Sequence, residues 1–380
     1  MIDRSPHLMV SLIGDIDKEP FAQVKYGFFI RALEREFRVN VCDVKLRRLQ
    51  RLFNGLVVFH PAFRIWKERF YQNLGAFKAR SRIVSRCLEK QKENIDIVLQ
   101  IGVLFNSTIQ NPDMPLIVYT DYTSKLSRDR IEQGRSPFPE EYFRQWFVHE
   151  QNVFHKAVRI YTRGSQVFDS IVQDYGIPAE KVSVVGGGLN YAELPALSTK
   201  KNSNPMVLFI GKDFYRKGGD MVVEAFHRAR RQLPDIRLTM VTTIPGSFTG
   251  DLTGVTVIKP TWDRDRISAL YREADCFILP SRLETWGDVL LEAMAFGLPC
   301  IGVADEAMAD IIIHEKTGLL AAPGDLNDLA KSLEYLLSDK EARQKYGRAA
   351  RLRVESLYTW ERVAARMIPG IREVSEMLSG

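Results

Sequence analysis

Residues 280–299 read PSRLETWGDVLLEAMAFGLP, and this stretch decides the fold because it leads from a strand into a capped helix. The apolar run 276–279 before it is typical of a buried strand. A helix is predicted from about Trp286 to Phe296, because Gly297 suits a left-handed cap and Pro299 prevents continuation. The stretch is therefore predicted to be one strand–loop–helix unit of an α/β protein.

The same alternation extends in both directions along the 380 residues. Near-continuous apolar runs separated by helical patterns indicate parallel sheets covered on both faces. Helices are predicted over 24–37, 165–175, 220–232 and 264–273. Strands are predicted over 8–13, 39–41, 95–101, 116–119, 159–161, 182–185, 206–210, 237–241, 255–258, 276–279 and 300–303.

The segment 186–205 interrupts this alternation with Gly, Ser, Asn and Pro, which is typical of a linker. The chain length favours two domains. We predict doubly wound α/β domains over 1–190 and 205–357, and a last helix over 358–380. Ligands of such sheets bind beyond the carboxyl ends of the strands, so a cleft between the domains is the expected active site.

The helix after the loop 280–287 has the features of a phosphate site. Its first-turn N–H groups lack partners within the helix, and Gly287 allows a ligand to approach the backbone. Glu292 could accept the hydroxyls of a ribose, and Glu284 could face a sugar. Taken alone, a glutamate such as Glu284 is more often a common charge at a helix start, and one such as Glu292 is more often a solvated helix residue. Asp288 would repel a diphosphate unless it points away.

The segment resembles the E-x7-E signature of the retaining GT-B glycosyltransferases of family 4, with Glu284 and Glu292 as the pair. Residues 207–219, VLFIGKDFYRKGG, resemble the donor loop of that family. Residues 314–325 resemble its downstream turn, and residues 184–190 resemble its junction between domains. The resemblance covers roughly 145–365 and implies two Rossmann-like domains facing each other across a cleft.

The family implies roles for individual positions. It implies transfer with retention and without a covalent enzyme nucleophile, from a UDP- or GDP-sugar to a hydroxyl acceptor in polysaccharide or glycolipid synthesis. No metal is expected, because the six histidines are scattered and no DxD motif stands out as a cation site. Catalytic roles are expected for Glu284, Arg216, Lys217 and Asp121, and acceptor-side roles for Gly14 and Asp15. Donor contacts are expected from Gly211, Lys212, Arg216, Lys217, Lys259, Pro260, Glu284, Trp286, Gly287, Asp288, Val289, Leu290 and Glu292.

Three positions depart from the family pattern. Lys212 stands where an arginine is common, and an ammonium lacks the planar fork of a guanidinium. The loop after residue 13 keeps Gly14 but lacks a second glycine. Asp121 stands where many relatives have a histidine, and either a turn cap or a substrate contact would explain it.

Thirteen Lys and Arg residues lie between Lys45 and Lys92, opposed only by Glu68 and Glu89. The whole chain has a net charge of +6, so the remainder is mildly acidic. Leu and aromatic residues alternate with these cations, which suits an anionic membrane surface, a lipid diphosphate acceptor or a plain solvated face. Nucleic acid is not expected, because no binding motif accompanies the charge.

No apolar run reaches the roughly 20 residues of a membrane span, and residues 1–6 do not resemble a signal peptide. The four cysteines form no CxxC pair, so they are expected to be reduced. We therefore expect a cytoplasmic protein, peripheral to the inner membrane face if the basic block binds lipid. The alternatives are a GT-B enzyme of another type, such as a sugar-nucleotide epimerase or a phosphorylase, and a non-catalytic nucleotide-sugar-binding protein.

Overall fold

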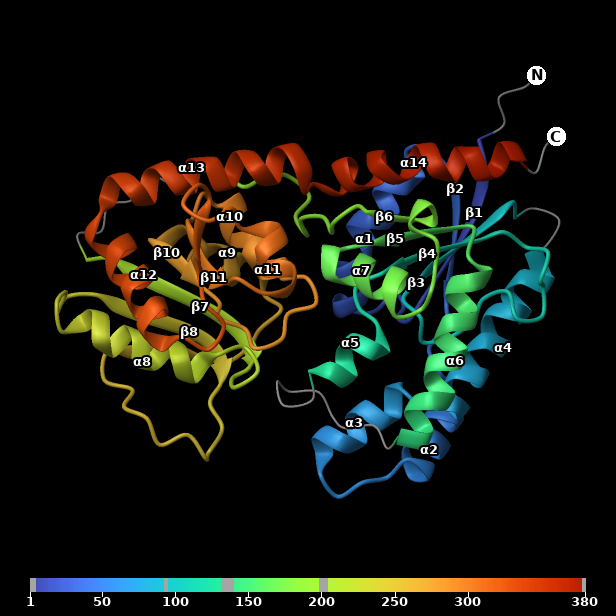
Figure 1. The fold of residues 1–380 in the computed structure, drawn as a ribbon, viewed down its shortest axis with the longest axis horizontal. Helices are drawn as coiled ribbons and strands as arrows, with labels where there is room; N and C mark the ends of the chain where they lie inside the picture. Colours follow the sequence, from blue (N-terminus) through green and yellow to red (C-terminus); the bar gives the residue numbers. More distant parts are fainter. Residues whose placement is uncertain (1–4, 92–94, 131–139, 198–203, 378–380) are drawn as a thin grey trace. The chain divides into compact units, whose positions relative to one another are not determined.

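The computed structural model describes residues 5–91, 95–130, 140–197 and 204–377. The chain forms two compact units (Figure 1). Unit 1 comprises the residues up to Gly186 together with those from Val363 onward, and unit 2 comprises Gly187–Arg362. No helix in the described ranges is long and apolar enough to span a membrane.

Unit 1 is built on a six-stranded parallel sheet with the strand order β2-β1-β3-β4-β5-β6. Four of these strands are buried along nearly their whole length, as the apolar runs predicted. The strands are β1 His7–Leu12, β2 Arg38–Asp43, β3 Ile97–Ile101, β4 Leu116–Thr120, β5 Arg159–Thr162 and β6 Val182–Val184. The helices are α1 Pro20–Glu34, α2 Arg48–Val57, α3 Phe63–Tyr71, α4 Leu74–Gln91, α5 Ser124–Asp129, α6 Glu140–Lys156 and α7 Ser165–Gln173, with a 3₁₀ turn at Ala179–Lys181.

The last helix, α14 Trp360–Met377, returns to the edge of the unit 1 sheet. The hydroxyl of Tyr161 in β5 donates to the carbonyl of Met367 at 3.0 Å, and Arg366 Nε donates to the carbonyl of Val185 at 3.0 Å. Gly370 lies so close to this tyrosine that an added Cβ would be 2.4 Å from its hydroxyl. Burial raises the pKa of Tyr161 to about 12, so the donor stays protonated.

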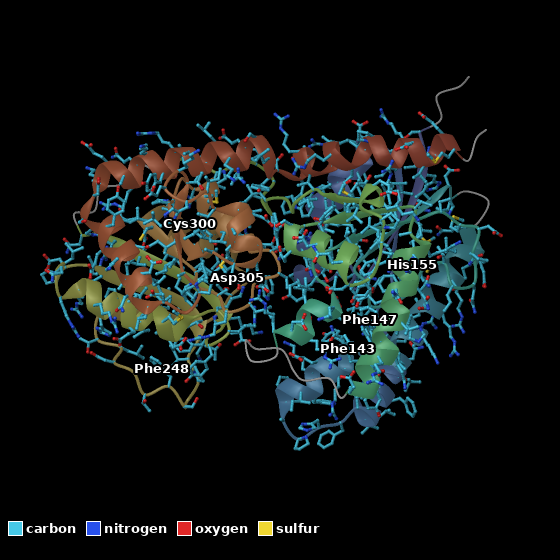
Figure 2. All side chains as sticks on the ribbon, viewed as in Figure 1. Phe143, Phe147, His155, Phe248, Cys300 and Asp305 are labelled. Atoms are coloured by element: carbon cyan, nitrogen blue, oxygen red, sulfur yellow. The ribbon has the colours of Figure 1, made fainter. Side chains whose placement is uncertain are left out.

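A buried carboxyl group ties helix α6 to the rest of unit 1. Glu150 is almost fully buried and accepts hydrogen bonds from the backbone and hydroxyl of Ser124 and from the hydroxyl of Tyr175. Phe147 on the same helix stacks on Tyr175 with ring centroids 4.4 Å apart, and Phe143 lies one turn earlier (Figure 2). Burial raises the pKa of Glu150 to about 7, although the three hydrogen bonds oppose this shift.

Unit 2 repeats the architecture with a second parallel sheet of order β12-β11-β10-β7-β8-β9. Helices α8 and α12 lie side by side, and α13 packs against α10 (Figure 1). The strands are β7 Met206–Asp213, β8 Arg237–Thr243, β9 Val255–Ile258, β10 Cys276–Ile278, β11 Cys300–Val303 and β12 Gly318–Ala321. The helices are α8 Gly219–Arg230, α9 Arg264–Glu273, α10 Asp288–Ala295, α11 Glu306–Ile311, α12 Leu326–Ser338 and α13 Lys340–Leu357.

These two sheets confirm the predicted fold class, an α/β protein with two doubly wound parallel sheets. Helix α9 has the predicted bounds, whereas α1 begins four residues earlier than predicted because Pro20 occupies a first-turn position, where its missing N–H is harmless. Strand β12 was not predicted: it extends the sheet beside β11, with Gly318 paired to Cys300. Cys276 and Cys300 are buried reduced thiols, as expected.

Candidate functional site

Two loops of unit 2 meet at the carboxyl ends of the adjacent strands β7 and β10. Gly218 adopts a left-handed φ of 74° just before α8, and a Cβ there would lie 2.2 Å from the carbonyl oxygen of Pro280. Only glycine permits this contact between the two backbones. Arg282 N–H donates to the carbonyl of Arg216 at 2.8 Å and closes the same junction. The loops 212–218 and 280–287 therefore form one connected surface.

Lys217 and Glu284 form an ion pair at the centre of this surface. Their side chains are 13% and 6% exposed, and Ser281 Oγ donates to the same Oε2 of Glu284 at 3.1 Å. Burial raises the pKa of Glu284, but Lys217 and the hydrogen bonds outweigh it and hold the pKa below its usual value. Burial lowers the pKa of Lys217, and Glu284 only partly opposes this. The site thus holds a buried ionised pair.

Arg216 is fixed beside this pair. Its Nη1 donates to the carbonyl of Leu283 at 2.8 Å, and its Nε donates to Asp213 at 3.3 Å. The guanidinium therefore spans from its own loop to the residue before Glu284. Arg216 and Lys217 thus lie within electrostatic range of each other on the same loop, and their binding of a diphosphate stays a prediction.

Glu306 is a site residue that was not expected from the sequence. It accepts a hydrogen bond from the backbone N–H of Glu284, and it is nearly buried at the start of α11. Its φ of 48° is unusual for a residue with a side chain, and strained positions of this kind cluster at functional sites. A glutamate in the first turn of a short helix was the only sequence signal. Glu306 fixes the backbone that carries Glu284.

Glu292 lies inside α10, and its carboxylate is held at both oxygens. Arg264 Nη2 donates to Oε1 at 3.0 Å, and the hydroxyl of Tyr271 donates to Oε2 at 3.1 Å. Burial raises the pKa of Glu292 even though Arg264 opposes the shift. Arg264 also lies over the ring of Tyr191, 4.2 Å from its centroid. Arg264 and Tyr271 come from α9 and were not predicted as site residues.

At the start of α10, one of the first-turn N–H groups that were expected to lack a partner is hydrogen-bonded. Gly287 has a φ of 99°, and its carbonyl accepts the N–H of Leu290 at 2.9 Å. The backbone N–H of Leu290 is therefore already hydrogen-bonded. Val289, in the first turn, is half-buried. Asp288 acts electrostatically on both Lys217 and Glu292.

Trp286 is buried in the core of unit 2, edge-on to Tyr358 at 5.7 Å between ring centroids. An added Cβ on Gly187 would lie 2.6 Å from its Nε1. Gly211 is likewise packed against the aliphatic part of Lys217. Trp286 and Gly211 are therefore packed against other residues of unit 2. Lys212, Lys259 and Pro260 are exposed at the ends of β7 and β9.

The predicted acceptor-side residues belong to unit 1. Gly14 has a φ of 131°, donates to Asp43 at 2.8 Å and leaves no room for a Cβ beside Ala22. Asp15 accepts the N–H groups of residues 17 and 18, so it closes a turn. Asp121 follows β4 and is half-buried within electrostatic range of Lys25.

The two six-stranded parallel sheets define a fold class, the GT-B fold. Sucrose-phosphate synthase from Thermosynechococcus elongatus matches with a TM-score of 0.70 at 17% identity over 97% of this chain and 99% of that chain. The HepE protein of Anabaena in complex with UDP-glucose matches with a TM-score of 0.64 at 14% identity over 98% of this chain and 99% of that chain.

Sequence comparison gives a family match within unit 2. Residues 191–353 match the family described as "Glycosyl transferases group 1". A "D-inositol 3-phosphate glycosyltransferase" of Pseudarthrobacter chlorophenolicus is 29% identical over 271 residues, which are 66% of this chain and 63% of the relative. The match thus spans just under two thirds of that relative. The family match covers less than half of the chain and contains Lys217, Glu284 and Glu292.

Proposed function

We propose that this protein is a retaining glycosyltransferase of family 4 that uses a nucleoside-diphosphate sugar and needs no metal ion. The observation that carries the proposal is the buried Lys217–Glu284 ion pair, which lies beside Arg216 and before the first turn of α10. Two fixed cations near a helix N-terminus suit a diphosphate, and the adjacent carboxylate suits a sugar.

The cations would act on the leaving group. When the bond from the anomeric carbon to the diphosphate breaks, negative charge grows on the phosphate oxygen. Lys217 and Arg216 are already held in place, so they would stabilise this charge more in the transition state than in the ground state. This role would replace that of a metal ion, and activity should survive a chelator.

Retention would follow from attack on the same face of the sugar. The acceptor oxygen forms the new bond to the anomeric carbon, the diphosphate leaves with the bonding electrons, and its oxygen takes the acceptor proton. Lys217 and Ser281 both bind Oε2 of Glu284, so we propose that Oε1 accepts a sugar hydroxyl.

Glu292 is proposed to bind the ribose of the donor. An ionised carboxylate has about four acceptor positions, so the hydrogen bonds from Arg264 and Tyr271 leave capacity for two hydroxyls. The base would lie near Lys259 and Pro260, and UDP or GDP is the proposed nucleotide. The UDP-glucose complex of the similar Anabaena structure supports a nucleotide sugar of this kind.

Unit 1 is proposed to supply the acceptor side, through Gly14, Asp15 and Asp121. The proposed acceptor is a hydroxyl of a glycan or a lipid-linked sugar, in polysaccharide or glycolipid synthesis. Asp121 has the carboxylate needed to bind such a hydroxyl.

A thermal-shift screen with UDP-, GDP- and ADP-sugars tests the donor site. We expect one nucleotide to stabilise the wild type, Lys217→Ala to lose most of this shift, and Glu292→Ala to weaken it. Lys331→Ala, an exposed lysine on α12, is the matched control and should keep the shift. The proposal fails if no nucleotide sugar stabilises the wild type, or if Lys217→Ala responds like the control. An unchanged shift in Glu292→Ala would refute only the ribose role.

A further inference from the structure

Helix α2 in unit 1 has its apolar face exposed and its polar side buried. Its apolar residues recur at the spacing of one helical face, which in a globular protein packs against the core. Here the buried residues of α2 are Asn54 and Gly55, and the apolar face is exposed. The exposed apolar residues of α2, the connection after it and the start of α3 are Leu49, Leu52, Phe53, Leu56, Val57, Phe59 and Phe63, each at least 60% exposed.

Specific hydrogen bonds fix this orientation. Asn54 Nδ2 donates to the carbonyl of Phe70 at 2.9 Å, and the indole of Trp66 donates to the carbonyl of Gly55 at 2.8 Å. The ring of Trp66 also lies against Gly55, where an added Cβ would be 3.5 Å away. We call the segment 48–71 the α2–α3 hairpin. Its polar inner face is internally bonded, so the apolar outer face is a defined surface.

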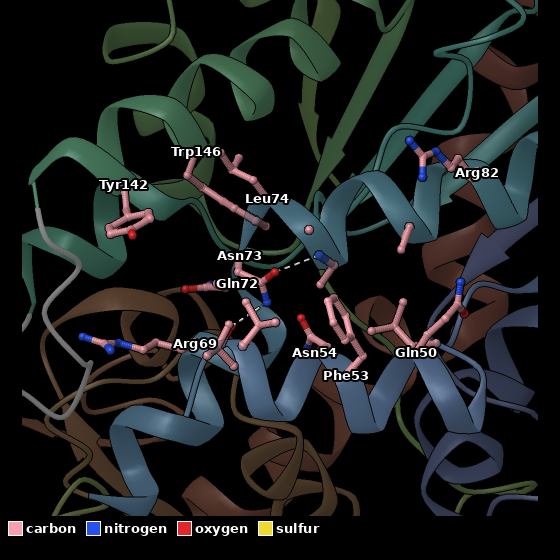
Figure 3. A pocket seen from close by; sticks show the side chains of 16 residues that line it. Gln50, Phe53, Asn54, Arg69, Gln72, Asn73, Leu74, Arg82, Tyr142 and Trp146 are labelled. Carbon is pink, nitrogen blue, oxygen red and sulfur yellow. Dashed lines mark hydrogen bonds between the residues drawn. The ribbon is translucent and has the colours of Figure 1, made fainter. Parts of the chain in front are cut away.

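Hollows flank α2 on both sides. One, of about 500 Å³, lies between α2, α4 and α6 and is lined by Phe53, Leu74 and Trp146 (Figure 3). The other, of about 1150 Å³, is more open and is lined by Leu52, Leu56, Phe59, Phe63 and Trp66 among others. Protein interiors leave few voids larger than a water molecule, so α2 is not packed as a core helix. The apolar surface of the hairpin is larger than a scatter of single exposed side chains.

The charge around this surface has one sign. Residues 45–72 contain seven Lys and Arg residues and a single acidic residue, Glu68. Arg48, Arg51 and Lys67 are exposed on the same two helices, and Arg47 is exposed directly before α2. Arg80, from the basic block of the sequence, is instead buried and donates to the carbonyl of Tyr71 at 2.7 Å. Lys78, Arg82, Arg86 and Lys90 on α4 are exposed as well, so the cationic surface continues from the hairpin onto α4.

We propose that the α2–α3 hairpin docks on an anionic lipid bilayer, with its Leu and Phe side chains inserted among the acyl chains. A helix with arginines beside exposed Leu and Phe residues is the pattern of an interfacial membrane helix. The cations match an anionic headgroup layer in charge, and each contributes about a fivefold gain in binding. All large apolar residues that are exposed among the described residues of 45–92 lie within 48–71, so the proposal narrows the inserted part of the basic block to 48–71. It stands whether or not the proposed transfer reaction holds.

Vesicle flotation of the full chain tests the proposal. We expect binding to vesicles that contain phosphatidylglycerol, little binding to phosphatidylcholine alone, and loss of binding at high salt. Leu49→Asp/Leu56→Asp should abolish flotation. Leu352→Asp, at a leucine of α13 that is 63% exposed, is the matched control and should float like the wild type.

The charge is tested separately. Arg48→Gln/Arg51→Gln should weaken vesicle binding about thirtyfold, because two cations are lost. Arg348→Gln, at an exposed arginine of α13, should leave binding unchanged. Nucleotide-induced thermal shifts should stay at the wild-type value in the hairpin variants, which separates this proposal from the donor site.

Two results would overturn the proposal. One is equal flotation of the wild type and Leu49→Asp/Leu56→Asp. The other is the absence of flotation for the wild type. This second result includes self-association of the wild type in ultracentrifugation, with the same double variant abolishing the association. In that case the hairpin would be a contact between two copies of the chain.

Discussion

Replacing Lys217 with alanine should destabilise unit 2 much more than the loss of an ordinary ion pair, because it leaves Glu284 as an unpaired buried charge. The two side chains are only 13% and 6% exposed. Removing one partner of a buried pair costs about 3–5 kcal/mol, whereas a surface pair contributes about 1 kcal/mol or less. We expect Lys217→Ala to cost about 3 kcal/mol, and Glu284→Gln in the same chain to restore much of it.

The loss of stability in Lys217→Ala should depend on pH, and the pKa of Glu284 sets the direction of this dependence. In the wild type the pKa of Glu284 is lowered, so its contribution to stability is present above the unfolded pKa and is lost as the pH falls through the folded pKa. Without Lys217, burial would raise this pKa, and the variant would lose stability as the pH rises. The stability gap between the two proteins should therefore widen between about pH 5 and pH 8.

Hydrogen exchange of peptides from α10 measures this effect locally, which avoids treating a two-unit chain as a single transition. Protection should fall about a hundredfold in Lys217→Ala and recover in the double variant. Arg228→Ala, which removes the exposed pair with Glu224 on α8, is the control. Equal protection in Lys217→Ala and Arg228→Ala, or no recovery with Glu284→Gln, would refute the buried-pair argument.

Three further changes test other parts of the structure. Gly218→Ala should lower the melting temperature of unit 2 more than Gly324→Ala, since both have a φ of 74° but only the first would place a Cβ against Pro280; equal losses in calorimetry would contradict this. Glu150→Gln should remove a loss of up to about 3 kcal/mol in wild-type stability between pH 4.5 and pH 7, because the raised pKa of about 7 favours the protonated folded form; parallel stability–pH curves would exclude this. Tyr271→Phe should weaken nucleotide binding about tenfold in calorimetric titration by removing the hydrogen bond to Glu292, and unchanged affinity would separate this tyrosine from the site.

The sequence predicted the layers of the fold because its buried strands are near-continuous apolar runs. Strand β12 was missed, because Gly318–Ala321 is short and lies between turn signals. The meeting of the loops that carry Lys217 and Glu284 follows from the neighbouring carboxyl ends of β7 and β10. These features could be predicted because they depend on the order of strands and helices, which the apolar runs along the chain indicate.

Other features depend on how single helices are rotated, and a pattern alone does not show this. Arg264 and Tyr271 contact Glu292 because one side of α9 faces α10, and Glu306 bonds to the backbone of Glu284 through an unusual φ. Helix α2 is the clearest case. Its apolar and basic residues left a membrane surface, a lipid acceptor site and a solvated face open, and hydrogen bonds from Asn54 and Trp66 fix the apolar face outward.

The central claim, a retaining transferase with its donor site in unit 2, is tested most directly by the configuration of the released sugar. The donor found by thermal shift, in its α form, is incubated with the protein and with water as the acceptor, and early proton NMR spectra are recorded. We predict that the α anomer appears first and that Lys217→Ala releases sugar at least a hundredfold more slowly. Initial release of the β anomer would contradict retention, and release by Lys217→Ala at the wild-type rate would contradict the assigned site.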